Sequence, residues 1–192
     1  MIKAIVFDYA GVLVDGPLIQ WLKENIDDVL ERKRILSEVA HKGDLWEGTF
    51  DAFLTFVGSR IGISKDDVLG TVYREAMVKK DVFDLVKKLK QTYTIVLFSN
   101  NQHEAVYEVL HRNDVLYLFD ELIISSKYKL LKPQPAFFQK MLSILHMKKE
   151  EIIFFDDTKE NVETARQLGI SAFLFKDAKQ LQKDLAGMGI TT

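Results

Sequence analysis

The residues of this sequence with the clearest chemical potential lie directly after short apolar segments. They are a single aspartate, a serine–asparagine pair, a lysine and a pair of aspartates: Asp8, Ser99, Asn100, Lys132, Asp156 and Asp157. A carboxylate can attack phosphorus and carry a covalent aspartyl phosphate, and Mg²⁺ prefers oxygen ligands such as carboxylates, waters and phosphate oxygens. Serine hydroxyls, backbone amides and lysine ammonium groups can hold the oxygens of a phosphoryl group. Together these residues offer the groups that phosphoryl transfer from a monoester requires.

The apolar segments are typical of strands that are buried on both faces of a sheet. They are short, nearly continuous and rich in β-branched residues, and they span residues 2–7, 94–98, 122–124, 152–155 and 172–175. Segments with helical period separate them. This alternation predicts an α/β fold with a doubly wound parallel, Rossmann-like sheet. Ligands of such sheets bind beyond the carboxyl ends of the strands, where the polar residues would meet.

Residues 15–80 interrupt the alternation. They show only helical periodicity, in four segments, and the last segment begins at Ser64, whose hydroxyl can cap the helix. The pattern predicts an all-α cap that is inserted after the first strand. We therefore expect an α/β core formed by residues 1–14 and 81–192 and a helical cap formed by residues 15–80.

Composition excludes several classes of protein. The chain has 192 residues, of which 47% are hydrophobic, and a formal net charge of −2, so no basic field predicts a nucleic-acid partner. The absence of cysteine excludes disulfides, thiolate metal sites and a cysteine nucleophile. No apolar run approaches the length of a membrane span, and the opening residues are too short for a signal-peptide core. We expect a cytoplasmic protein, monomeric or homodimeric.

Four motifs, in chain order, resemble those of the haloacid dehalogenase superfamily of hydrolases. They are Ile-Val-Phe-Asp8-Tyr-Ala-Gly-Val-Leu, Val-Leu-Phe-Ser99-Asn100, Lys132-Pro133 and Phe-Phe-Asp156-Asp157-Thr-Lys-Glu-Asn161. The resemblance covers essentially the whole chain, and the helical insertion is similar to the type-1 cap of that superfamily. The Ser-Asn and Asp-Asp…Asn forms look closest to small bacterial sugar-phosphate phosphatases, including α-D-glucose-1-phosphate phosphatases, and to the phosphatase domain of soluble epoxide hydrolases.

This resemblance implies magnesium-dependent hydrolysis of a small phosphate monoester, with a sugar phosphate favoured, through an aspartyl-phosphate intermediate. It implies that the nucleophile is Asp8 and that Lys132 acts with it in catalysis. The residues implied to hold the substrate phosphate are Ser99, Asn100 and Lys132. The ligands implied for Mg²⁺ are Asp8, the backbone carbonyl of Ala10, and Asp157.

Asp156 and Asn161 are expected to support this site. Asp156 can either bind the metal directly or orient Lys132, and we favour the second role. Asn161 lies four residues after Asp157, so on a helix it can point back toward the same pocket.

Ala10 departs from the pattern of most phosphatases of this superfamily, which have a second aspartate two residues after the nucleophile as general acid and base. Such help is typically worth roughly 10²–10⁴ in rate. Its absence predicts a substrate whose leaving group needs little protonation, such as an anomeric hydroxyl.

Two alternatives remain open. Ala10 also resembles the Asp-x-Ala-Gly start of phosphonoacetaldehyde hydrolases, which cleave a C–P bond through a cap lysine; Lys42 is the conceivable counterpart. A catalytically silent binding module is the second, and Ala10 is its only support. A response-regulator receiver is disfavoured because receivers place the acidic pair after the first strand.

Overall fold

A five-stranded parallel sheet forms the centre of the protein in the computed structural model, which describes residues 1–74 and 76–191. In chain order the strands are β1 (Ala4–Phe7), β2 (Thr94–Ser99), β3 (Glu121–Ile124), β4 (Ile152–Asp156) and β5 (Ser171–Leu174). The spatial order is β3-β2-β1-β4-β5. Every predicted strand is confirmed, and β1 occupies the middle of the sheet, so Asp8 follows the central strand.

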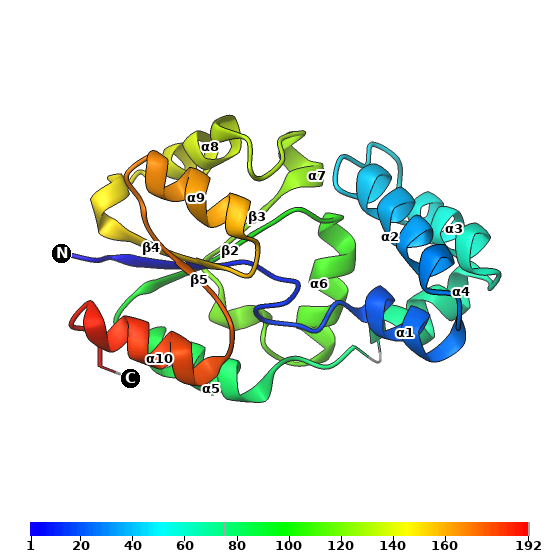
Figure 1. The fold of residues 1–192 in the computed structure, drawn as a ribbon, viewed down its shortest axis with the longest axis horizontal. Coiled ribbons are helices and arrows are strands. Elements are labelled where there is room, and N and C mark those ends of the chain that lie inside the picture. The colour runs from blue at the N-terminus through cyan, green and yellow to red at the C-terminus, as the bar shows by residue number, and fades with distance from the viewer. Residues whose placement is uncertain (75, 192) are drawn as a thin grey trace.

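Helices cover both faces of this sheet (Figure 1). Alternate residues of β1 belong to different hydrophobic clusters: Ile5 and Phe7 to one, Ala4 and Val6 to the other. The first cluster includes residues of α5 (Lys80–Leu89), α6 (His103–Arg112) and α10 (Ala178–Gly187). The second includes residues of α8 (Pro135–Leu145) and α9 (Lys159–Gln167). The predicted doubly wound α/β fold is therefore confirmed.

Three short helices complete the sheet domain. They are the 3₁₀-helix η2 (Leu116–Leu118), α7 (Ser125–Tyr128) and the 3₁₀-helix η3 (Lys149–Glu151). Because α7 begins directly at the carboxyl end of β3, its side chains lie at the edge of the sheet where ligands of parallel sheets bind.

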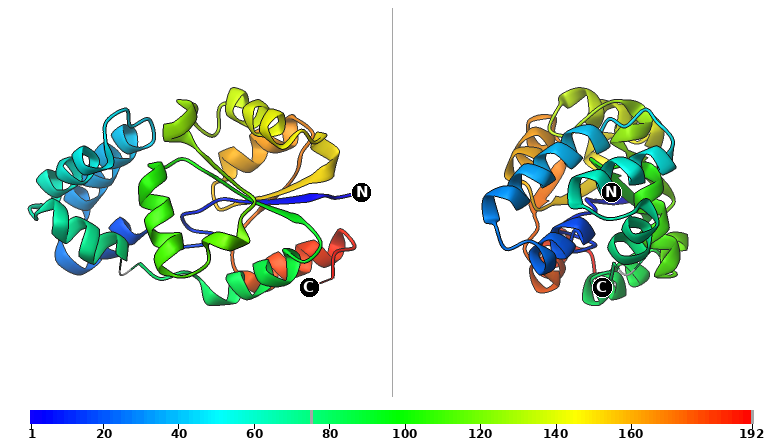
Figure 2. Two further views of the ribbon diagram at one scale, coloured as in Figure 1. Left: turned by 180° about the vertical axis from the view of Figure 1, so that it is seen from behind. Right: turned by 90° about the vertical axis from the view of Figure 1, so that its right-hand side faces the viewer.

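The regular elements described between β1 and α5 are all helices, apart from isolated bridges at Ala10, Val14 and Val78, and we call residues 17–74 the helical insert. It comprises α1 (Pro17–Asn25), α2 (Val29–Gly43), α3 (Phe50–Ile61), α4 (Lys65–Asp67) and the π-helix η1 (Val68–Arg74). The insert lies at the carboxyl ends of the strands, opposite the N-terminus (Figures 1 and 2). Three of its helices begin at side chains that accept backbone N–H bonds: Asp28, Thr49 and Ser64.

The last helix of the insert differs from the sequence prediction. We expected one α-helix from Ser64 to Ala76, but a single α-turn is followed by a π-helix that ends at Arg74. The wider turn of a π-helix brings residues five apart onto one face. Val68 and Tyr73 are both buried as a result, at 0% and 6% exposure, and Tyr73 reaches the cavity described below.

The two chain segments that connect the sheet to the insert run side by side. Val14 and Val78 form an antiparallel bridge, and the backbone N–H of Lys79 donates to Leu13 O at 2.9 Å. The Lys79 ammonium donates to Gly11 O at 2.6 Å and pairs with Asp15 at 3.1 Å. The loop after β1 is thus tied to the return path of the chain.

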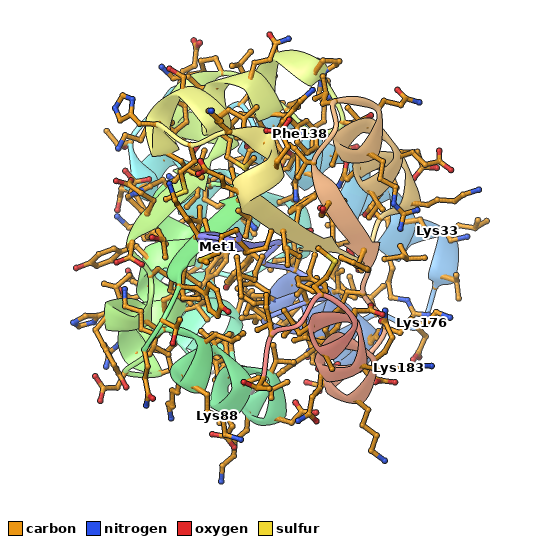
Figure 3. All side chains as sticks on the ribbon, turned by 90° about the vertical axis from the view of Figure 1, so that its left-hand side faces the viewer. Met1, Lys33, Lys88, Phe138, Lys176 and Lys183 are labelled. Carbon is orange, nitrogen blue, oxygen red and sulfur yellow. The ribbon has the colours of Figure 1, made fainter. Side chains whose placement is uncertain are left out.

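The opposite edge of the sheet has the character of ordinary protein surface. Viewed from that side, Lys88, Lys176 and Lys183 extend outward, whereas Phe138 belongs to the packed interior (Figure 3). Across the described parts of the chain, no helix has both the length and the apolar character needed to cross a membrane.

The packing of Phe138 leads to a prediction of stability. Its ring is fully buried and contacts the rings of Phe98 and Phe154, with centroids 5.2 and 5.7 Å away. Phe138→Ala should lower the free energy of unfolding in urea by about 3–5 kcal/mol, because it removes buried contacts and leaves a cavity. Tyr117→Ala is the matched control, since Tyr117 is 63% exposed and should change stability by less than about 0.5 kcal/mol. Similar small losses in both variants would contradict this packing.

Candidate active site

Asp8 lies just beyond β1 with its carboxylate held in one orientation. Its Oδ1 accepts hydrogen bonds from the backbone N–H of Tyr9 at 2.7 Å and from the Lys132 ammonium at 2.8 Å. Oδ2 accepts neither bond and is available to a ligand. Asp8 is 7% exposed. Burial raises its pKa to about 6; Lys132 opposes this rise and Asp156 adds to it.

Lys132 places a buried positive charge between two carboxylates. Its Nζ contacts Asp156 Oδ2 at 2.6 Å and Phe98 O at 2.9 Å, in addition to Asp8. The side chain is 1% exposed. Burial alone would lower the pKa of Lys132, but the negative charges of Asp8 and Asp156 outweigh it and raise this pKa. Lys132 therefore stays an ammonium ion with its three donor directions fixed.

Asp156 is completely buried, and its acceptor positions are occupied by protein donors. Besides Lys132, the backbone N–H of Thr158 donates to it at 2.8 Å, and Asn161 Nδ2 lies 3.0 Å from both of its oxygens. These contacts fix the rotamer of Asp156, which in turn fixes Lys132. The geometry favours orientation of Lys132 by Asp156 over direct metal ligation, and Asn161 contacts Asp156.

Asp157 completes a group of carboxylates that can hold a metal ion. One oxygen each from Asp8, Asp156 and Asp157 lies within 4.8 Å of the others. Burial, and after it the charge of Asp156, raises the pKa of Asp157. A divalent cation would relieve this crowding of negative charge, and oxygen donors are those that Mg²⁺ prefers. The donor set therefore fits magnesium.

Gly11 makes room for this arrangement. Its φ of +83° lies in the left-handed region, which favours glycine. A Cβ atom at Gly11 would lie 1.9 Å from Asp157 Oδ2, well inside van der Waals contact. The loop after β1 can therefore approach the carboxylate only because residue 11 lacks a side chain.

Ser99 and Asn100 end the neighbouring strand β2. Ser99 is 1% exposed, and among the described residues its hydroxyl donates only a long hydrogen bond, 3.5 Å, to Asn100 O. The Asn100 side chain donates to Lys132 O and accepts from Lys132 N, both at 2.8 Å. These two hydrogen bonds fix the backbone at Lys132. Because they occupy the Asn100 side chain, only the backbone N–H of Asn100 is left to contact a phosphate. Helix α6 is capped by Gln102, whose side chain accepts a hydrogen bond from the backbone N–H of Ala105.

A cavity of about 210 Å³ lies between the sheet and the insert, next to Ala10. Most of its lining is apolar, and the polar groups come from Tyr9, Asp44, Tyr73, Asn100 and Asn101. The Tyr9 hydroxyl is buried and has no hydrogen-bond partner among the described residues. A second, open hollow contains Asp8, Gly11, Asp157 and Thr158, and Ala10 borders both spaces. The site thus has an acidic side and a mainly apolar side.

Three of these residues were not identified from the sequence. Tyr9 lies inside the first motif but looks like an apolar strand-end residue. Asp44 ends α2, and Tyr73 lies in the π-helix, so both reach the cavity only because the insert packs on the sheet edge. The single sequence signal was the polar Lys42-Gly43-Asp44 stretch at the end of a predicted helix.

Comparison with known proteins assigns the family. A family model described as haloacid dehalogenase-like hydrolase matches residues 2–169. The chain belongs to this family of hydrolases, as its motifs indicated.

Individual relatives are more distant. The D-ribitol-5-phosphate phosphatase of Bacteroides thetaiotaomicron is 27% identical over 206 residues, with 96% of this chain and 97% of that protein covered. The drimenol cyclase of Aspergillus calidoustus is 26% identical over 197 residues; the match covers 98% of this chain but only 37% of that longer protein. A haloacid dehalogenase family enzyme of B. thetaiotaomicron, crystallised with magnesium and inorganic phosphate, superposes with a TM-score of 0.74 at 22% identity over 94% of this chain and 99% of that one. The last match shows a shared fold.

The raised pKa of Asp8 predicts how stability depends on pH in metal-free protein. The folded state holds the proton of Asp8 up to about pH 6, whereas the unfolded state releases it near 3.8. Ionised Asp8 therefore costs folding free energy above about pH 6, a smaller amount between the two values, and none below them. Asp8→Asn, which keeps an oxygen for Tyr9 and Lys132, should be more stable than the native protein at pH 8 and lose this advantage toward pH 4.

Urea unfolding in EDTA at pH 4, 6 and 8 measures this effect. Asp84→Asn is the control, because Asp84 is an exposed residue of α5 and should show no such trend. An Asp8→Asn advantage that is constant across this range would contradict the raised pKa.

Proposed function

We propose that this protein catalyses magnesium-dependent hydrolysis of a small phosphate monoester, with a phosphorylated sugar as substrate, through an aspartyl phosphate on Asp8. One observation carries the proposal. Asp8 has a free Oδ2, a buried ammonium ion bound to its Oδ1, and the carboxylate of Asp157 close by. This combination supplies a nucleophile, a positive charge for the phosphoryl oxygens and a metal site.

The residues around Asp8 divide the remaining work. In this proposal the transferred phosphoryl group contacts the Ser99 hydroxyl, the Asn100 backbone amide and the Lys132 ammonium. Mg²⁺ would be held by Asp8, the backbone carbonyl of Ala10, and Asp157. When bound, the ion offsets the repulsion between the anionic nucleophile and the anionic substrate.

Asp156 holds Lys132 in place, and Asn161 in turn holds Asp156. With its contacts to Asp8, Asp156 and Phe98 O, the Lys132 ammonium has a partner for each of its three N–H groups. In the first step Oδ2 of Asp8 forms a bond to phosphorus as the bond to the ester oxygen breaks. In the second, water attacks phosphorus and releases Asp8 and inorganic phosphate.

We assign the helical insert as a cap of the type-1 kind, within the boundaries 15–80, over a core of residues 1–14 and 81–192. Support comes from its position at the carboxyl ends of the strands and from Asp44 and Tyr73, which line the cavity together with sheet-end residues. The cavity of about 210 Å³ suits a small leaving group, and the partner we propose is accordingly a small phosphorylated metabolite.

The sugar-phosphate assignment rests on similarity as well as on size. One relative that matches at nearly full length is a phosphatase of D-ribitol 5-phosphate, and one structure with the shared fold contains magnesium and phosphate. C–P bond cleavage through Lys42 gains no support, because Lys42 is exposed, lies over the Phe56 ring and does not line the cavity.

The direct test is phosphate release from a panel of sugar phosphates, nucleotides and p-nitrophenyl phosphate. We expect turnover with Mg²⁺, loss of turnover in EDTA with recovery on added Mg²⁺, and at least a ~10³-fold fall in kcat in Asp8→Asn, because the nucleophile is removed. Asp84→Asn should match the native protein. No turnover of any ester, or equal turnover in Asp8→Asn, would instead favour the silent binding module.

A further inference from the structure

None of the three residues directly after the nucleophile carries a carboxylate. Ala10 has a methyl group where an acid would be required, and its neighbours are Tyr9 and Gly11. Ala10 borders both the hollow that contains Asp8 and the apolar cavity, so a leaving group that extends past Ala10 from a phosphate at Asp8 would enter this cavity. A residue that replaces the missing acid must therefore reach this cavity from another element.

We propose that Asp44, at the end of α2 in the helical insert, is the general acid and base of this reaction. This inference rests on the proposed phosphatase function and adds to it the residue that protonates the leaving group and activates the water.

The position of Asp44 supports the role. It lines the same cavity as Tyr9, Ala10 and Asn100, and its charge interacts with those of Lys132 and Asp8. No hydrogen bond from the described side chains or backbone groups reaches the Asp44 carboxylate, so it offers its oxygens to a ligand. Of the described residues that line the cavity, it is also the only one with a carboxylate.

The backbone around Asp44 is fixed to the sheet domain from α7. The Ser125 hydroxyl donates to Asp44 O at 2.5 Å. The Lys129 ammonium donates to Leu45 O at 3.1 Å and also to Trp46 O. A carboxylate on an inserted helix can act in catalysis only when its position relative to the nucleophile is defined, and these contacts define it.

The environment of Asp44 suits transfer of a proton in both directions. Burial raises its pKa to about 7; Lys132 opposes the rise and Asp8 adds to it. A general acid that must later act as a base works best with a pKa near the working pH.

The other titratable groups nearby do not fit this role. Burial raises the pKa of the Tyr9 and Tyr73 hydroxyls further above their ordinary value, so they keep their protons and can only donate hydrogen bonds. His103 lines a different hollow, with Trp46 and Ser126. Of the titratable groups that line the apolar cavity, Asp44 is left as the one that can exchange a proton with the substrate.

The proposed steps balance. As the Asp8 Oδ2–P bond forms and the P–O bond of the ester breaks, the Asp44 carboxyl proton moves to the departing oxygen and gives a neutral alcohol. Asp44, now a carboxylate, takes a proton from the water whose oxygen attacks phosphorus. The Asp8–P bond breaks, inorganic phosphate leaves, and Asp44 is again protonated.

Asp44→Asn tests the first step through its dependence on the leaving group. An alkoxide needs a proton to leave, whereas a p-nitrophenolate does not. We expect kcat/KM to fall about 10²-fold or more for alkyl and sugar-6-phosphates but less than ~10-fold for p-nitrophenyl phosphate. Asp44→Ser is measured beside it in case the amide perturbs folding. Glu47→Gln, an exposed change three residues away, should leave both values unchanged.

The second step has its own readout. Phosphoenzyme hydrolysis should slow in Asp44→Asn, so rapid mixing with p-nitrophenyl phosphate should show a burst of nitrophenolate, about one per enzyme, before slow turnover. Ala10→Asp in the Asp44→Asn background should restore kcat/KM for alkyl phosphates at least tenfold, because it returns a carboxyl group to the cavity.

Equal losses for both kinds of ester, or no loss, would overturn the role of Asp44 while native turnover continues. Absence of turnover in the native protein would instead reject the phosphatase function itself, so the two failures are distinguishable.

Discussion

The site depends on one buried ammonium ion, that of Lys132 between Asp8 and Asp156. Burying a charge without a partner is costly, so this lysine specifies where both carboxylates must lie. The carboxylates follow β1 and end β4, which are neighbouring strands in register, and Asn100 after β2 braces the lysine loop. A shift of either strand would leave the ammonium ion unpaired. The pairing of the central strands and the electrostatics of the site therefore constrain each other.

The same interaction sets a conflict between stability and function. The carboxylate of Asp8 is desolvated and lies beside two further aspartates, and its pKa is raised although Lys132 pairs with it. A fold optimised only for stability would neutralise this residue. Gly11 serves the same site, since its left-handed conformation and missing side chain make room for Asp157. The desolvated carboxylate of Asp8 is therefore unfavourable for folding at the place where a cation would offset its charge.

The sequence predicted those parts of the molecule that depend on local pattern. Apolar runs gave all five strands, and since reactive residues follow strands directly, Asp8, Ser99 and Asp156 could be placed at one edge. The π-helix was missed because its register depends on burial of Tyr73 in the packed insert, not on periodicity along the chain. Asp44 was missed for the same reason. Its spacing from the motifs carries no information, and only the packing of α2 against α7 brings it to the cavity.

This limit changes the meaning of Ala10. From the sequence alone, Ala10 implies a reaction without proton transfer, which is restricted to leaving groups that need no proton. In the folded protein, the small side chain of Ala10 borders the cavity that Asp44 also lines. On this proposal the nucleophile belongs to the sheet and the acid to the insert, with Ser125 and Lys129 joining the two. Proton transfer then requires contact between α2 and α7, whereas attack by Asp8 does not. A substrate that prevents contact between α2 and α7 would bind beside the nucleophile but without the general acid. The position of the insert would then contribute to specificity in two ways, by the fit of the substrate and by the supply of a proton.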